Sequence, residues 1–261
     1  MNPDIEQVKK IIANSGNNLH CKVLRYFQDK NWTVLISPYY NDNMSDKPRE
    51  IDLIAEKAFD VTDRHDKPDG FLNIRLFIEC KFIPQKTVFW FHSKDRMRAE
   101  ELIINNTPLY KDNDYTQQHH YLYQKYDHVA KLFDTETKRK AEGEIIYKAI
   151  NQSLNAMVYY RNSRTLIPAS PGRETEALST LCYPVIVCNG FNNLYRVDID
   201  TGNEPTNIKD NFQLEVNYAY LDSSKNPVTE YFLIDVVSLD RIDTLMDSLE
   251  KDARVVKIIL R

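Results

Sequence analysis

Apolar residues recur along this chain with two different periods, and each period predicts a different kind of element. Spacings of three and four residues predict amphipathic helices over residues 4–14, 19–30, 94–104, 118–134, 144–162 and 239–252. Alternating or continuous apolar runs predict strands over residues 32–36, 48–55, 74–82, 86–91, 183–188, 194–199, 212–221, 229–237 and 254–260. Helices and strands are interleaved along the whole chain, which indicates an α/β protein.

The order of these elements predicts a mixed sheet flanked by helices. A helix is followed by three strands joined by polar segments, which favours an antiparallel opening to the sheet. The helix at 144–162 and the nearly all-apolar strand at 183–188 come later, and that strand reads as buried on both faces. Residues 86–143 fit this core less well, and we expect them to form a helical insertion in a single domain covering residues 1–261.

The second and third predicted strands carry charged residues on one face. Strand side chains alternate between the two faces of a sheet, so Glu79 and Lys81 lie side by side on the third strand. The same alternation puts Glu50 beside Asp52 on the second strand. If the two strands are neighbours, three carboxylates and one ammonium group meet on one face of the sheet.

This combination of groups is suited to a divalent metal ion. Mg²⁺ prefers oxygen ligands and is usually held by one or two carboxylates together with water and a substrate phosphate. Bound there, it polarises a phosphodiester and supplies a hydroxide-like nucleophile. We expect Asp52 and Glu79 to be the ligands, Lys81 to orient the water or offset charge on the phosphate, and Glu50 to be an accessory ligand or base. Mn²⁺ is expected to substitute for Mg²⁺.

A solvated sheet face is the simpler explanation of the same pattern. Antiparallel sheets commonly have one wet face, where Glu and Lys alternate. The β-branched and aromatic residues around Glu79 instead favour a central strand, and charged residues in such places are rarely buried unless they are paired. The metal-site interpretation is therefore favoured, and the solvated face stays open as the alternative.

The two segments that carry these charges resemble the signature of the PD-(D/E)XK nucleases. Arg49-Glu50-Ile51-Asp52-Leu53-Ile54-Ala55 and Ile78-Glu79-Cys80-Lys81 are similar to the paired strand motifs of its small resolvase-like branch. The resemblance implies a restriction-endonuclease-like core and Mg²⁺-dependent hydrolysis of DNA phosphodiester bonds, in DNA processing or restriction-type defence. It implies Asp52, Glu79 and Lys81 as the working set. Many members act as dimers, so a homodimer is a further expectation.

Two more positions become accessory candidates through this resemblance. Resolvase-like members often carry a glutamate on the helix before the first strand, and His20 stands at that place here. His20 is expected to ligate metal, accept a proton or contact phosphate, or else to be an ordinary histidine on the helix surface. Some RecB-like nucleases carry a glutamine on a helix near the active site, which makes Gln152 a candidate. Otherwise Gln152 is simply a polar residue on a helix.

Composition narrows the choice of function. The net charge of −4 and the pI near 5.9 argue against a strongly basic protein that coats nucleic acid, but they leave a nuclease open. Only 6 glycines are present, without a Rossmann or P-loop fingerprint, which argues against a nucleotide-binding protein of either kind. The alternative to a nuclease is a catalytically silent protein of the same fold that binds nucleic acid or a protein partner.

The cysteines and the N-terminal sequence predict the cellular compartment of the protein. The 4 cysteines have neither zinc-site nor disulfide-framework spacing, which is typical of reduced thiols. The first residues lack the basic and apolar regions of a signal peptide, and no stretch approaches the roughly 20 apolar residues of a membrane helix. We therefore expect a cytoplasmic protein with no membrane contact.

Overall fold

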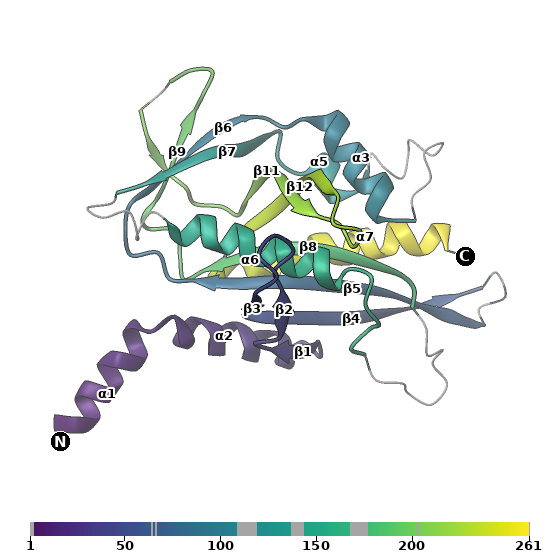
Figure 1. Cartoon of the computed structure of the whole chain (residues 1–261), viewed down its shortest axis with the longest axis horizontal. Coiled ribbons are helices and arrows are strands. Elements are labelled where there is room, and N and C mark those ends of the chain that lie inside the picture. The colour runs from purple at the N-terminus through teal and green to yellow at the C-terminus, as the bar shows by residue number, and fades with distance from the viewer. Residues whose placement is uncertain are drawn as a thin grey trace.

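A ten-stranded mixed sheet organises the chain (Figure 1). The computed structural model describes residues 3–63, 65, 67–108, 119–136, 144–167, 177–202 and 204–260. Within these residues the helices are α1 (Pro3–Asn14), α2 (Gly16–Asp29), α3 (Arg96–Asn106), α5 (Tyr121–Gln124), α6 (Glu144–Tyr160) and α7 (Ile242–Ile259). None of these helices has both the length and the apolar character needed to cross a membrane.

The large sheet has the strand order β1-β4-β5-β8-β12-β11-β7-β6-β9-β10, and β2 and β3 form a separate two-stranded sheet. The strands are β1 (Thr33–Ile36), β2 (Tyr39–Asn41), β3 (Pro48–Glu50), β4 (Leu53–Thr62), β5 (Pro68–Lys81), β6 (Thr87–Ser93), β7 (His128–Thr135), β8 (Ala177–Cys188), β9 (Leu194–Asp198), β10 (Thr206–Asn207), β11 (Phe212–Leu221) and β12 (Pro227–Ser238). The predicted α/β class with a mixed sheet is confirmed.

The segment of the chain that leads to the candidate residues begins with helix α2. Strands β1, β4 and β5 follow and pair antiparallel in chain order, as predicted. The chain later passes through α6 and enters β8, which pairs parallel to β5. Parallel neighbours need a long crossover, and a helix packed on the sheet commonly provides it. Helix α6 therefore packs on β8 and on β5, the strand that carries both Glu79 and Lys81.

Alternation along β4 and β5 assigns a different helix to each face of the sheet. Glu56 lies opposite Arg75, and both side chains contact the residues that follow α6. Lys57 lies opposite Ile74, and its ammonium group reaches Glu250 on α7 at 3.4 Å. Consecutive side chains of a strand point to opposite faces, so α6 and α7 cover opposite faces of this pair of strands.

Helix α6 forms because its apolar residues follow the helical period. The apolar residues Ile146, Ile150, Leu154 and Met157 are buried at spacings of three and four, as the sequence predicts. Burying this stripe against β5 and β8 leaves the opposite side of the helix available for polar residues.

The helix predicted over residues 118–134 is wrong. Its place is taken by the four-residue α5 and by β7, which pairs antiparallel with β6 and parallel with β11. The expected helical insertion at 86–143 therefore adds two strands, β6 and β7, to the large sheet, besides α3 and α5. Strand pairing with distant residues overrode the local pattern. Residues 109–118 and 137–143 of that segment lie outside the described residues.

The strand predicted over residues 254–260 is also wrong. Helix α7 continues through this segment to Ile259, and Val256 is buried one turn after Ala253. A short apolar run is compatible with either a strand or a buried helix, and the preceding helical register decides the outcome here.

A buried ion pair connects the two strands that carry the candidate residues. Arg75 on β5 and Glu56 on β4 contact each other with side chains that are 1% and 0% exposed. The second carboxylate oxygen of Glu56 accepts hydrogen bonds from the Thr165 hydroxyl and the Leu166 backbone N–H, both at 2.7 Å. Both oxygens of this buried carboxyl group therefore have donors as partners.

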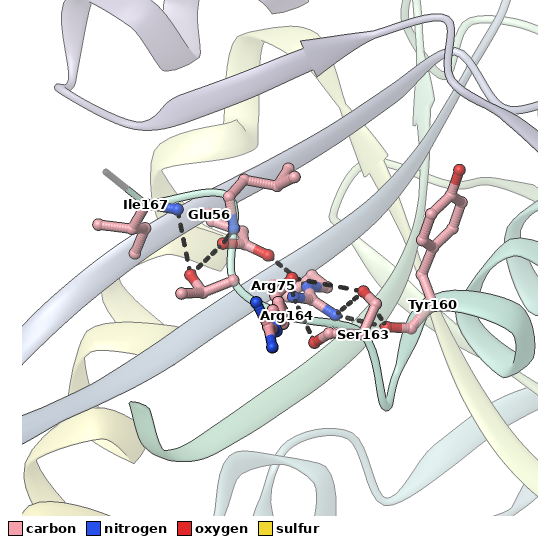
Figure 2. A network of polar contacts seen from close by, with 8 residues as sticks. Glu56, Arg75, Tyr160, Ser163, Arg164 and Ile167 are labelled. Atoms are coloured by element: carbon pink, nitrogen blue, oxygen red, sulfur yellow. Dashed lines mark hydrogen bonds and ion pairs between the residues drawn. The ribbon is translucent and has the colours of Figure 1, made fainter. Parts of the chain in front are cut away.

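Figure 2 shows Arg75 lying between Glu56 and the end of α6. Its guanidinium group donates to the backbone carbonyls of Tyr160 (2.5 Å), Ser163 (3.3 Å) and Arg164 (2.9 Å). The last carbonyls of a helix have no partner within the helix, and a cation placed there also interacts favourably with the helix dipole. Arg75 thus fixes the C-terminal end of α6 to the sheet.

Replacing Arg75 with methionine is expected to destabilise the protein by about 3 to 5 kcal/mol, because the carboxylate of Glu56 is left buried without its cation. Urea unfolding followed by circular dichroism measures the change. The matched control is Arg241→Met, which removes a half-exposed partner of Asp210 and should change stability by less than about 1 kcal/mol. Equal effects of the two substitutions would contradict the structural role given to Arg75.

Candidate active site

Asp52 and Glu79 lie side by side where β4 begins and β5 approaches its end. Leu53 pairs with Ile78, which brings the residues on either side of that pair together as well. The Asp52 backbone N–H donates to Glu79 Oε1 at 3.3 Å, and the Cys80 backbone N–H donates to Asp52 Oδ2 at 2.7 Å. Glu79 is fully buried, whereas Asp52 is partly exposed. The structure therefore brings the two predicted carboxylates together.

Lys81 joins this pair from the end of β5. Its ammonium group donates to Glu79 Oε2 at 2.5 Å and to Gln152 Oε1 at 3.4 Å. The Gln152 amide also donates to the Glu50 backbone carbonyl at 3.0 Å. Gln152 thus connects α6 to β3 and holds one side of the lysine. The Lys81 side chain is 18% exposed, so a bound molecule can reach it.

Glu50 does not share a strand with Asp52, although the sequence predicts that it does. The predicted continuous strand over 48–55 is wrong, because β3 ends at Glu50 in the two-stranded sheet and β4 begins at Leu53 in the large one. Its carboxylate accepts a hydrogen bond from the Tyr39 hydroxyl, the neighbour across β2 and β3. The backbone of Glu50 contacts the site through Gln152, while the role predicted for its carboxylate stays a prediction.

His20 lies on α2 and is half-buried. Its Nε2 atom is buried without a hydrogen-bond partner among the described residues. Within the same residues, no hydrogen bond or ion pair joins His20 to Asp52 or Glu79. The accessory role predicted for His20 therefore has no contact supporting it and stays a prediction.

Burial dominates the electrostatics of the site. The pKa of Glu79 is raised to about 8: burial is the largest cause, the charge of Lys81 opposes it, and the neighbouring Asp52 adds to the rise. Burial lowers the pKa of Lys81, but the charges of Glu79 and Asp52 outweigh this and raise it overall. The site thus combines one ammonium group with two carboxyl groups, and one of these, Glu79, keeps its proton to an unusually high pH when no metal is bound.

The two carboxyl groups suit a metal ion that keeps part of its water. Among the described residues, no group of three or more His, Cys, Asp or Glu side chains could hold a metal ion, so that part of the chain contains no closed protein cage. Mg²⁺ commonly needs only one or two carboxylates, with water and phosphate completing its coordination. A divalent cation would also favour the ionised form of the buried Glu79. Asp52 and Glu79 therefore fit such an ion.

A pocket of about 560 Å³ adjoins this group of residues. It lies between the β2–β3 sheet, α6 and β11, and Gln152 lines it while also contacting Lys81. The sequence does not reveal this pocket, because the residues that line it come from segments far apart in the chain. One signal was available: Tyr147, Asn151 and Asn155 recur at helical spacing on α6 and form a polar stripe.

Comparisons with known proteins add nothing to this geometry: no family model, no curated protein and no solved structure matches the chain.

Glu79→Gln is expected to change how stability depends on pH when EDTA keeps divalent metals away. The pKa of Glu79 is about 8 in the folded protein and has its usual value of 4.5 in the unfolded chain. Between these two pH values the unfolded chain releases a proton that the folded protein keeps, so the wild-type protein loses stability as the pH rises. The loss is at most about 1.4 kcal/mol for each pH unit.

Urea unfolding at pH 5 and pH 8 measures this dependence. The stability of Glu79→Gln relative to the wild-type protein should increase between the two pH values, because glutamine has no proton to lose. A difference that stays constant with pH would show that Glu79 is already ionised at pH 5, against the direction given by its burial.

Proposed function

We propose that this protein is a divalent-metal-dependent nuclease that hydrolyses DNA phosphodiester bonds. The observation that carries the proposal is the convergence of two carboxyl groups, one ammonium group and one amide from three different elements. Asp52 precedes β4, Glu79 and Lys81 end β5, and Gln152 comes from α6. A solvated sheet face explains this arrangement poorly, because Glu79 is fully buried.

The order of elements supports a restriction-endonuclease-like core. Elements α2, β1, β4, β5, α6 and β8 give a helix, three antiparallel strands, a helix and a strand parallel to the third one. Strands β2 and β3 lie between β1 and β4 in the chain, and β6, α3, α5 and β7 lie between β5 and α6. The PD-(D/E)XK resemblance implies this order, and it also implies that the motif residues lie near the ends of the second and third strands. The order of elements is present here and supports the proposal in addition to the motif residues.

The chemistry follows from the positions of the side chains. Asp52 and Glu79 would hold the metal ion, which polarises a phosphodiester and lowers the pKa of a bound water. Lys81 would donate to that water or to a phosphate oxygen that gains charge in the transition state. Gln152 accepts a hydrogen bond from Lys81 and so holds the ammonium group in place beside Glu79. Lys81 can shift from Glu79 to phosphate because it is partly exposed.

Asp52→Asn and Lys81→Ala are each expected to lower DNA cleavage by about 10²-fold or more, as the removal of one charged transition-state contact typically does. Plasmid and linear DNA are incubated with purified protein in Mg²⁺ or Mn²⁺, and the products are followed on gels. Asparagine keeps the acceptor for the Cys80 N–H, so Asp52→Asn should remain folded.

Lys57→Ala is the matched control for Lys81→Ala. Lys57 belongs to the adjacent strand but points to the opposite face, where it contacts Glu250. Cleavage should stay close to the wild-type rate in this variant. Near wild-type cleavage by a clean preparation of Asp52→Asn or Lys81→Ala would contradict the proposal.

A binding protein of the same fold that does not hydrolyse DNA is the second candidate. It is favoured by one observation: among the described residues, no third His, Cys, Asp or Glu side chain joins the two carboxyl groups in a metal-binding cluster. DNA binding that persists in EDTA, with no cleavage in either Mg²⁺ or Mn²⁺, would select this candidate over the nuclease.

A further inference from the structure

The pocket beside the candidate active site is lined by aromatic rings and amides. Tyr40 and Tyr218 form buried walls, and Tyr147 stands 60% exposed on α6. Aromatic faces bind nucleobases by stacking, and amide groups hydrogen-bond to the edges of bases. A volume of about 560 Å³ falls in the range of small-ligand pockets, so one nucleoside fits where a duplex does not.

Asn155 gives the pocket an unsatisfied polar group. This residue lines the pocket and is 5% exposed, yet its Oδ1 atom is buried without a hydrogen-bond partner among the described residues. Buried acceptors are nearly always paired, so an unpaired one at a pocket wall indicates a missing donor. The exocyclic amino and ring N–H groups of nucleobases are donors of this kind.

Two observations connect the pocket to the candidate active site. Gln152 lines the pocket and accepts a hydrogen bond from Lys81. The Gln152 amide also donates to the backbone carbonyl of Glu50, the residue that follows Arg49 in the pocket wall. A nucleotide in the pocket would therefore lie beside a phosphate bound at Asp52 and Glu79.

The charges at the pocket also suit a nucleotide. Its described lining includes two cations, Arg49 and Lys148, and one carboxylate, Asp42. Asp42 is balanced by Arg49 at 3.6 Å and by backbone N–H groups of Met44 and Ser45. The Arg49 side chain is half-exposed, so its guanidinium group can also contact a phosphate of a bound nucleotide.

We propose that this pocket holds one unpaired nucleotide of a DNA strand, with its base on Tyr147 and an edge of the base on the side-chain amide of Asn155. The proposal rests on the proposed nuclease function and names its substrate class: DNA that is single-stranded or has an unpaired nucleotide beside the cleaved bond. Paired bases are stacked and hydrogen-bonded in the duplex, so they cannot enter such a pocket without being extruded.

Binding is tested with the full chain in EDTA, where metal-dependent cleavage does not interfere. Fluorescence anisotropy compares a short single-stranded DNA oligonucleotide, the fully paired duplex and the RNA of the same sequence. Single-stranded DNA should bind most tightly, and Asn155→Leu and Tyr147→Leu should each weaken it about tenfold. Asn105→Leu, a substitution of an exposed asparagine on α3 outside this pocket, is the matched control and should change nothing.

Stability measurements separate a binding role of Asn155 from a structural one. Leucine has a similar size and removes an unsatisfied acceptor, so Asn155→Leu should keep or raise the resistance of the protein to urea. Weaker binding in an equally stable variant supports the proposal. A variant that loses stability but binds DNA normally when folded overturns it.

Different experimental results would overturn the pocket proposal and the proposed nuclease function. Metal-dependent cleavage that prefers paired duplex and is indifferent to Asn155→Leu would overturn the pocket proposal and leave the nuclease intact. Single-stranded DNA binding that depends on Asn155, without cleavage under any condition, would support the pocket and overturn hydrolysis. Binding of RNA alone would overturn the assignment to DNA.

Discussion

The buried contact between Arg75 and Glu56 fixes where α6 lies on the sheet, and the candidate active site depends on that position. Arg75 is 1% exposed, and it holds both the adjacent strand and the carbonyls at the end of α6. The same helix, two turns earlier, presents Gln152 to Lys81. A buried guanidinium group without acceptors is strongly unfavourable, so helix and sheet are locked together at this end. The polar stripe of α6 is thereby directed at Lys81 and at the neighbouring pocket.

Burial and charge act against each other in the candidate active site. Two carboxyl groups and one ammonium group lie together, and burial raises the pKa of Glu79 to about 8. Strong perturbation by desolvation together with a specific charged partner is typical of functional groups, although structural ion pairs produce it too. The contrast with Glu56 is informative. Its carboxylate is equally buried but is completely surrounded by donors, whereas Glu79 has its charged partner on a side chain that remains partly exposed.

Local patterns predicted the parts of the fold in which neighbouring residues decide the outcome. The apolar stripe of α6 and the alternation along β5 were both read correctly, and this alternation places Glu79 and Lys81 on one face. The errors fall where distant contacts decide. Residues 128–135 form β7 because β6 and β11 offer backbone partners, and residues 254–259 stay helical because α7 already sets the register. The break between β3 and β4 separates Glu50 from Asp52 for the same reason, since each strand pairs in a different sheet.

The sequence by itself determined which side chains are available and which of them share a strand face, because alternation and helical spacing are properties of the local backbone. The sequence alone indicated that Asp52, Glu79 and Lys81 form one charged cluster on a sheet face, provided that their strands are neighbours. Only the tertiary structure decided that β4 lies next to β5, that Gln152 reaches Lys81, and that Tyr40, Asn155 and Tyr218 enclose one pocket. These contacts join residues that are far apart in the chain. They depend on sheet order and helix packing, which no local pattern encodes.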